Sequence, residues 1–553
     1  MDLTDHFGGR MKKGARMTRI FFPQFKKGKQ GIETEKGSIL DSARTLGIEI
    51  PSECGGRGLC GKCRVRVQGE GILGPRTEAE KSFKLGRDER LACQARVMRG
   101  GSIRVFIKST GRYAILSDTI EDKVKLDSFV YRKNDKVFWH DRELDKFRDG
   151  VYGLAIDVGT TTLVSQIIDL ESGKRIATFA DKNPQASFGD DVISRIDHTM
   201  RNKDGLRELQ NVVIEGINAG LRRIAEEKGE ILNHIYEAVV VGNSTMRSIF
   251  FGVDVSSLGV IPFEPLTCEP INRKAEELSL KINPKANVYG VPLIGGHAGA
   301  DALADIIATG IYKAGRPSMV IDIGTNGEVI IGNKDRILTA SCAAGGAYEG
   351  ATISSGVGAV EGAIKNIRII NGRVQYETIG NKPSLGICGS GLIDLLGELF
   401  KNGIMSKKAK LKDDFFITPE ISISQQDIYQ LITAKAGLRL DQDLLIKYYL
   451  ATLKEVNRIY LSGAFGNFIN PDNAILIGLL PRARNKVVRI GNGALAGARK
   501  MLLSREMRRD AEKIARKIEH IKPNEREENF SYMIAEKMYF EDEDELLKRD
   551  LSK

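Results

Sequence analysis

The hydrophobic pattern divides the chain into a small N-terminal region and a large central one. Over residues 18–108, short apolar stretches alternate with glycine-rich turns. This spacing predicts strands near 20–22, 64–67 and 103–107, with one helix near 38–46. We therefore expect a small mixed β-domain at the start of the chain.

From Val151 to about Ser504, predicted strands and helices alternate, which indicates an α/β fold. The sequence at 156–162 recurs at 321–327, and each copy has apolar runs on both sides. Asp322 thus follows Asp157 by 165 positions (322 minus 157). The pattern predicts strand, tight turn and strand, used twice, and so a duplicated fold.

Three charged segments flank these regions. Residues 1–17 form a leader without an apolar pattern, and 109–150 is charged and weakly patterned, which predicts a linker with little core. The last stretch is strongly charged, carries one amphipathic segment and ends in an acidic run. The expected domains are a disordered leader at 1–17, a small domain at 18–108, a linker at 109–150, a domain of two lobes at 151–504 (about 151–315 and 316–504), and a charged helical tail at 505–553.

Composition is ordinary for a globular protein, at 42% hydrophobic and 28% charged residues over 553 positions. No apolar run reaches the roughly 18 residues of a membrane span, and the N-terminus lacks the apolar core of a signal peptide. We therefore expect a cytoplasmic protein without a membrane partner.

The net charge of +11 is concentrated in the N-terminal region. Residues 18–108 hold 19 Lys and Arg against 10 Asp and Glu, a balance of +9. A basic patch often indicates nucleic acid, but neither stacking aromatics nor a nucleic-acid motif accompanies this one. We expect no nucleic acid. A cationic face can instead steer an acidic protein partner, and a merely solvated surface is the alternative.

Four cysteines, Cys54, Cys60, Cys63 and Cys93, follow the spacing C-x5-C-x2-C-x29-C. Four thiolates are the full ligand set of one 2Fe–2S cluster, and the plant-type loop C-x4-C-x2-C is one residue shorter than this one. The glycines between the first three cysteines allow the loop to curl and to point N–H groups at an anionic cluster. The sequence therefore predicts these four residues as the metal ligands.

Other interpretations of the same loop are weaker. Structural zinc usually takes two C-x(2–4)-C pairs, and here the last cysteine stands alone. Disulfides need an oxidising compartment, which nothing in the sequence indicates. Residues 56–62 also fit the start of a phosphate-binding P-loop, but Cys63 follows where Ser or Thr would hold Mg²⁺.

The duplicated turns have the chemistry of a phosphate site. An Asp at a strand end can hold Mg²⁺ through water, and glycine, hydroxyl and amide groups in a tight turn can contact phosphate oxygens. We expect Asp157 and Asp322 to be catalytic, managing Mg²⁺ and the attacking water. The expected nucleotide-binding residues are Gly159, Thr160, Thr161, Thr162, Gly324, Thr325, Asn326, Gly327, Gly389, Ser390, Gly391, Gly463 and Gly466.

These features resemble the ASKHA superfamily of acetate and sugar kinases, Hsp70 and actin. The chain is most similar to the reductive activators of corrinoid proteins, which join an N-terminal 2Fe–2S domain to an ASKHA-type ATPase. The resemblance runs from about Thr18 to Phe540. It is carried by the cysteine loop, Arg90–Gln94, Gly242–Met246, Gly345–Gly350 and Ser462–Gly466. One departure is the short linker, so we assume no separate domain between the two parts.

The resemblance implies an α+β ferredoxin-like (β-grasp) 2Fe–2S domain followed by an α/β ASKHA domain, the duplicated RNase H-like fold of actin-like ATPases. The implied cofactors are a 2Fe–2S cluster, ATP and Mg²⁺. The implied reaction returns a Co(II) corrinoid (cobalamin-binding) protein to Co(I) by one-electron transfer, driven by ATP binding and hydrolysis. An upstream electron donor and a homodimer are also implied.

Two other classes of function stay open. One is a small-molecule kinase with a fused redox module, although the sequence offers no general base beyond the Asp pair. The other is a redox-controlled ATP-binding switch.

The isolated Cys268, Cys342 and Cys388 are expected to be small packing residues. His297 and Asp301 stand in a glycine-rich turn, where Asp301 could join a Mg²⁺ site.

Overall fold

The computed structural model describes residues 17–24, 29, 31–46, 48, 50, 52, 55–59, 61–69, 71–83, 85–107, 124–189, 191–342, 346–350, 352–463 and 468–540. The expected leader, apart from Met17, lies outside the described residues, as do Cys54, Cys60, Gly466 and the acidic run at the C-terminus. The chain divides into two units, Met1–Thr110 and Gly111–Lys553.

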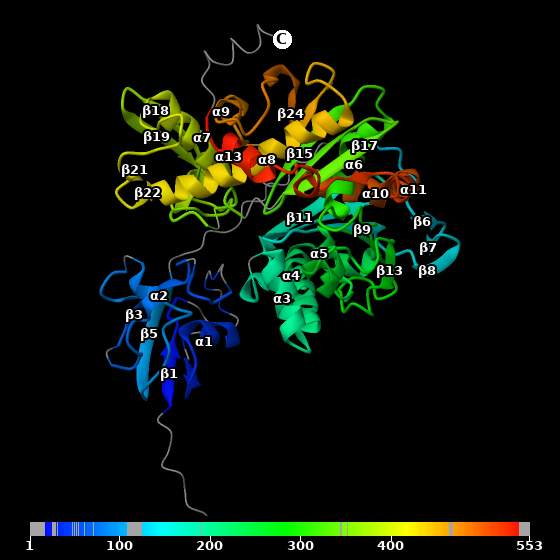
Figure 1. Cartoon of the computed structure of the whole chain (residues 1–553). Helices are drawn as coiled ribbons and strands as arrows, with labels where there is room; N and C mark the ends of the chain where they lie inside the picture. Colours follow the sequence, from blue (N-terminus) through cyan, green and yellow to red (C-terminus); the bar gives the residue numbers. More distant parts are fainter. Residues whose placement is uncertain are drawn as a thin grey trace, which may run out of the picture. The chain divides into compact units, whose positions relative to one another are not determined.

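The first unit is a five-stranded mixed sheet in the order β2-β1-β5-β3-β4 (Figure 1). Its elements are β1 (Thr18–Phe21), β2 (Ile32–Thr34), α1 (Ile39–Thr45), β3 (Arg64–Gln68), α2 (Glu78–Lys81), β4 (Glu89–Leu91) and β5 (Gly101–Ile107). Ser38 begins α1 with a capping box, since its hydroxyl accepts from the N–H of Asp41 and the Asp41 carboxylate accepts from the N–H of Ser38. The parallel pair β1–β5 within an otherwise antiparallel sheet confirms the predicted α+β ferredoxin-like domain.

The second unit contains the same strand arrangement twice. One sheet runs β11-β10-β9-β12-β14-β13 and the other β24-β23-β15-β16-β17-β25. In each, a central strand pairs antiparallel with the next strand of the chain and parallel with a later one. This repetition confirms the predicted duplicated α/β fold.

The first of these sheets comprises β9 (Tyr152–Val158), β10 (Thr162–Asp169), β11 (Arg175–Lys182), β12 (Ile235–Val241), β13 (Ile271–Lys274) and β14 (Asn287–Gly290). The second comprises β15 (Ser318–Ile323), β16 (Gly327–Gly332), β17 (Ile337–Cys342), β23 (Ile459–Ser462), β24 (Val487–Gly491) and β25 (Glu519–His520). The accompanying helices are α3 (Val192–Arg201), α4 (Gly205–Lys228), α5 (Ser244–Phe250), α6 (Ala300–Thr309), α7 (Gly389–Lys401), α8 (Gln425–Tyr449), α9 (Pro471–Leu476) and α10 (Gly493–Leu503). Smaller sheets are formed by β18 (Ala363–Ile370), β19 (Arg373–Thr378) and β20 (Gly386–Ile387), and by β21 (Phe415–Thr418) and β22 (Ile421–Ile423).

Helices α6 and α10 lie side by side and complete the core of the first lobe (Figure 1). Leu303 of α6 and Leu495 of α10 are fully buried in one cluster with residues of β9 and β12. Gly497 allows this contact, because a Cβ there would lie 2.0 Å from the carbonyl oxygen of Ala304. The lobes are therefore not simply consecutive in sequence, since α10 returns to the first of them.

The segment expected to be a linker contains a three-stranded sheet. It consists of β6 (Val130–Lys133), β7 (Lys136–Trp139) and β8 (Arg142–Lys146). Val130, Val137 and Leu144 are buried in the core of the first lobe. Charged residues surround these three positions, so the alternation was obscured in the sequence. The expectation of a linker with little core is wrong for these residues.

Residues 505–540 of the expected charged tail are folded as part of the second unit. It forms α11 (Arg505–Ala515), β25, α12 (Pro523–Arg526) and α13 (Phe530–Lys537), with β25 pairing against β17. Phe540 is buried, and the ammonium of Lys435 lies 5.1 Å from its ring centroid. No helix among the described residues is both long and apolar enough to cross a bilayer.

Candidate active site

The cysteine loop of the first unit brings two predicted ligands together. Cys63 and Cys93 are buried, and their sulfur atoms lie 3.3 Å apart. The side-chain amide of Gln94 points at Cys93 Sγ at 3.5 Å and also donates to the carbonyl of Gly56. Cys54 and Cys60 lie outside the described residues, so their places as ligands stay predictions.

Glycines shape this loop into a cradle. Gly58 and Gly61 have positive φ of 76° and 68°. A Cβ on Gly58 would lie 2.8 Å from the Gln94 amide, and one on Gly61 would lie 2.6 Å from the Phe83 ring. A side chain at either position would be strained by the positive φ and crowded by these neighbours, so both positions favour glycine. Two adjacent thiols in such a cradle fit a 2Fe–2S cluster.

Each of the two repeated turns of the second unit is closed by a backbone hydrogen bond that a glycine N–H donates. The N–H of Gly159 donates to Thr162 O at 3.1 Å, and the N–H of Gly324 donates to Asn326 O at 3.1 Å. A Cβ on Gly159 would lie 2.6 Å from that Thr162 oxygen. Both turns therefore place an aspartate at the end of one strand and hydroxyl groups at the start of the next.

Two of the predicted phosphate ligands are buried in the surrounding structure. Thr160 is buried, its hydroxyl accepts from Asn243 Nδ2 at 2.9 Å, and its carbonyl accepts from Arg195 Nη2 at 2.6 Å. Gly327 is also buried, and a Cβ there would lie 2.6 Å from Leu438 of α8. Thr160 and Gly327 therefore pack against other parts of the second unit, whereas Thr161 and Thr325 are half-buried.

Asp157 and Asp322 lie close enough to interact electrostatically, and two further aspartates join them. Asp157 and Asp322 are each half-buried as whole residues. Asp301 and Asp305 lie four residues apart on α6, and therefore on one face of that helix. Asp305 is fully buried and lies near enough to Asp322 for their charges to interact, and its Oδ1 accepts from Ser462 at 3.0 Å.

Burial raises the pKa of every carboxyl in this group. The pKa of Asp157 rises to about 7 because burial disfavours its charge; nearby Asp322 adds to the rise, and the Asn492 hydrogen bond opposes it. The pKa of Asp301 also rises to about 7, mainly through burial and then through the charges of Asp322 and Asp157. Burial likewise raises the pKa of Asp322 and Asp305. Such a concentration of acids is stabilised by a cation.

These acids fit a hydrated Mg²⁺. Among the described residues, no three acidic, histidine or cysteine side chains come close enough to enclose a metal ion. Mg²⁺ usually keeps several waters and takes only one or two carboxylates from the protein. Asp157 and Asp322 would hold the ion from opposite lobes, and a bound Mg²⁺ would supply charge neutralisation for the phosphates of ATP.

Four residues of this site were not predicted from the sequence. Glu328 follows the second turn, and its buried carboxyl has a pKa raised by burial and by Asp301 and Asp322. Asp305 could have been found from its i+4 spacing to Asp301. Asn492 donates to Asp157 Oδ2 at 2.7 Å, and Glu349 accepts from the hydroxyls of Thr161 and Thr325. No local pattern indicates either contact.

Other predicted residues lie in different surroundings. The hydroxyl of Ser390 donates to Lys365 O at 2.7 Å, and a Cβ on Gly391 would lie 2.3 Å from Ile364 O, so this loop is fitted to β18. Gly463 does approach the acids, since a Cβ there would lie 3.0 Å from Asp322 Oδ1. The His297 ring lies 5.8 Å from that of Phe263, in a group with His520, Glu264 and Lys522.

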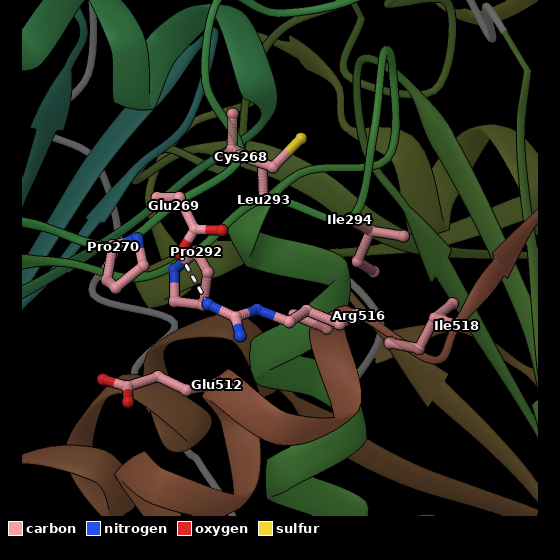
Figure 2. Close-up of a pocket in the computed structure, with 10 residues that line it drawn as sticks. Cys268, Glu269, Pro270, Pro292, Leu293, Ile294, Glu512, Arg516 and Ile518 are labelled. Carbon is pink, nitrogen blue, oxygen red and sulfur yellow. Dashed lines mark hydrogen bonds and ion pairs between the residues drawn. The ribbon is translucent and has the colours of Figure 1, made fainter.

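A cavity of about 200 Å³ lies elsewhere in the second unit (Figure 2). It is lined by residues of the loops beside β13 and β14 and of the α11 region, namely Cys268, Glu269, Pro270, Pro292, Leu293, Ile294, Glu512, Ala515, Arg516 and Ile518. Arg516 and Glu269 form an ion pair of 2.8 Å there, as Figure 2 shows. None of the predicted site residues lines this cavity, so it is distinct from the acid-lined site.

Comparison with known proteins identifies three consecutive regions. The model of a 2Fe-2S iron-sulfur cluster binding domain matches residues 25–98. The RACo middle region matches 152–314, and the C-terminal domain of RACo, the ASKHA domain, matches 316–549. The last match includes most of the segment that we predicted to be a separate tail.

Similar proteins match between 66% and 95% of this chain. The corrinoid activation enzyme RamQ of Eubacterium limosum is 30% identical over 559 residues, covering 88% of this chain and 93% of that protein. A [Co(II) methylated amine-specific corrinoid protein] reductase of Methanosarcina barkeri is 29% identical, covering 66% of this chain and 73% of that protein. A solved structure of a reductive activator for corrinoid, iron-sulfur protein superposes with a TM-score of 0.71 at 28% identity, covering 95% of this chain and 98% of that one. The chain therefore belongs to the RACo family, in which a 2Fe–2S domain precedes an ASKHA-type domain.

Proposed function

We propose that this protein is an ATP-dependent reductive activator, which returns a Co(II) corrinoid protein to Co(I) by transferring one electron. One observation carries the proposal: a single chain combines a cysteine cradle for a one-electron carrier with two acid-and-hydroxyl turns suited to Mg-ATP. The names of the relatives favour a corrinoid protein as the acceptor.

The energetics explain why both sites are needed. Co(I) is a strong reductant, and plant-type 2Fe–2S clusters have potentials near about −400 mV. Each 100 mV of unfavourable difference costs about 2.3 kcal/mol per electron. ATP binding and hydrolysis can offset such a cost by changing which conformation binds the corrinoid protein.

In this proposal the residues of the second unit bind and orient the nucleotide. Asp157 and Asp322 hold the waters around Mg²⁺ and align the attacking water, and Asn492 fixes the orientation of Asp157. The hydroxyls of Thr161 and Thr325 contact the phosphates from opposite lobes. Cys63 and Cys93, with Cys54 and Cys60, hold the cluster, whose chemistry when bound is one-electron transfer.

We further propose that an upstream protein donor reduces this protein. We also propose that this protein works in the cytoplasm, where thiolate ligands stay reduced, and that it forms a homodimer. The dimer is tested by measuring the molar mass in solution. A cell fractionation tests the location. The identity of the donor is tested by asking which reduced electron carriers restore the reduced spectrum of the protein.

The function is tested by mixing the anaerobically purified protein with a reductant, Mg-ATP and a Co(II) corrinoid protein, and by following the absorption band of Co(I). We expect the band only when ATP is present. Asp322→Asn should abolish both hydrolysis and the Co(I) band while leaving the visible spectrum of the cluster intact. Phosphorylation of a sugar or carboxylate without Co(I) formation would instead identify a kinase, and ATP binding without either product would identify a switch.

A further inference from the structure

One carboxylate joins the two phosphate-binding turns. Thr161 belongs to the β9–β10 turn and Thr325 to the β15–β16 turn, which come from different sheets. Their hydroxyl oxygens lie 3.0 Å apart. Thr161 donates to Glu349 Oε2 at 2.8 Å, and Thr325 donates to the same oxygen atom. Each hydroxyl has a single proton, and the Glu349 oxygen is an acceptor within reach of both of them.

This arrangement uses the groups that the proposed function assigns to phosphate. A carboxylate oxygen that accepts two hydroxyl protons presents the same anionic acceptor as a phosphate oxygen. The two hydroxyl protons cannot be donated to the Glu349 oxygen and to a phosphate oxygen at the same time. A phosphate that reaches Thr161 and Thr325 must therefore displace Glu349.

The backbone around Glu349 is held firmly. The neighbouring Tyr348 is fully buried, and its hydroxyl donates to Leu431 O of α8 at 3.0 Å. Gly350 has φ of 75°, and a Cβ there would lie 2.5 Å from Val357 N. Because both neighbours are closely packed, we expect the displacement to be a rotation of the Glu349 side chain rather than a movement of the whole segment.

We propose that Glu349 is a latch between the two lobes, which closes on the hydroxyls of Thr161 and Thr325 when no nucleotide is bound and is displaced by the terminal phosphate of ATP. The proposal rests on the phosphate site of the proposed function. ADP lacks the terminal phosphate and leaves the latch closed. Glu349 thereby makes the contact between the lobes dependent on the third phosphate.

The test measures nucleotide affinity by calorimetry for the wild-type protein, Glu349→Gln and the control Glu420→Gln, an exposed glutamate in the same lobe. Removing the competing charge should tighten binding of a non-hydrolysable ATP analogue by about tenfold, the scale of one hydrogen bond to a charged group. ADP affinity should change by less than about threefold. An equal change for both nucleotides, or weaker binding of the ATP analogue, would overturn the latch.

A second measurement follows thermal stability instead of nucleotide affinity. Without nucleotide, Glu349→Ala should melt at a lower temperature than wild type, because the latch is lost. With the ATP analogue at saturation, the difference should largely disappear, because the latch is already open. Unchanged melting of the nucleotide-free variant would refute the latch alone. Failure of the wild-type protein to bind either nucleotide would refute the phosphate site, and the latch with it.

Discussion

Asn492 Nδ2 donates a 2.7 Å hydrogen bond to Asp157 Oδ2, and the two residues are 335 positions apart in the chain. The other end of the same amide caps α10, since Asn492 Oδ1 accepts from the N–H of Leu495 at 2.7 Å. The Asn492 side chain thus fixes both the start of α10 and the orientation of the Asp157 carboxylate in the acid-lined site. Because α10 also completes the core of the first lobe, the acid is coupled to the packing of that lobe.

The two roles of Asn492 can be separated by substitution. Asn492→Ser keeps a capping oxygen but loses the donor to Asp157, so Mg²⁺-dependent ATP hydrolysis should fall about 10- to 100-fold with little change in melting temperature. Asn492→Asp also keeps the cap but adds a negative charge beside Asp157, and its loss should be larger. Hydrolysis rates and thermal melts check both expectations. Wild-type hydrolysis in Asn492→Ser would remove the positioning role.

The cluster ligands can be tested by metal content. Anaerobically purified protein should contain about two irons per chain. Cys63→Ala should lose most of this iron and its visible colour, whereas Cys268→Ala, in the cavity of the second unit, should keep both. ATP hydrolysis in Cys63→Ala reports that the second unit is still folded. Stoichiometric zinc in a colourless wild-type protein would support the zinc alternative instead.

The sequence predicted those helices and strands whose formation depends on residues close to one another in the chain. The capping box of Ser38 and Asp41 and the repeated apolar runs around Asp157 and Asp322 are all short-range features. The strands β6, β7 and β8 were missed because charged neighbours obscure their alternation. Contacts that form only on folding were also missed, such as those of Asn492 with Asp157 and of Glu349 with Thr161. The inward orientation of Thr160 follows from Asn243 and Arg195, which are likewise distant in sequence.

His520 should make the stability of the second unit depend on pH. Burial, helped by the positive charges of His297 and Lys522 and opposed by Glu264, lowers the pKa of His520 from 6.5 to about 4. The unfolded chain therefore binds more protons than the folded one between these values. The contribution of neutral His520 is complete above pH 6.5 and is lost as the pH falls toward 4, with an upper limit of about 3 kcal/mol.

The expected result is a smaller fall in melting temperature between pH 7.5 and pH 5 for His520→Asn than for wild type. His140→Asn is a matched control at the β7–β8 turn, where φ is 52° and asparagine is tolerated. Its pH dependence should follow wild type. Equal slopes for all three proteins would show that His520 does not carry the effect.

We expect the basic face of the first unit to contribute to partner docking. Arg64 and Arg66, on the strand that follows the cysteine loop, are poor positions at which to test this. Arg64 lies 3.7 Å from Glu89 and Arg66 lies 3.9 Å from Asp88, so reversing either charge would place two acids together within the sheet. Arg57 is exposed within the cysteine loop. Leu59 follows it by two positions and is 68% exposed. These two residues offer a positive and an apolar contact beside the cluster site.

We therefore expect Arg57→Glu to slow corrinoid reduction about tenfold at low salt, because exposed charges steer association over roughly the Debye length of about 8 Å at physiological ionic strength. Arg104→Glu is the matched control, since Arg104 is exposed on β5 opposite Gln68, at the end of β3 away from the cluster loop. The effect of Arg57→Glu should shrink as salt is raised, and basal ATP hydrolysis should stay constant in both variants. Equal slowing by the two substitutions would point to total charge rather than to a docking site at the loop. Equal salt sensitivity of corrinoid reduction and ATP hydrolysis would remove electrostatic docking altogether.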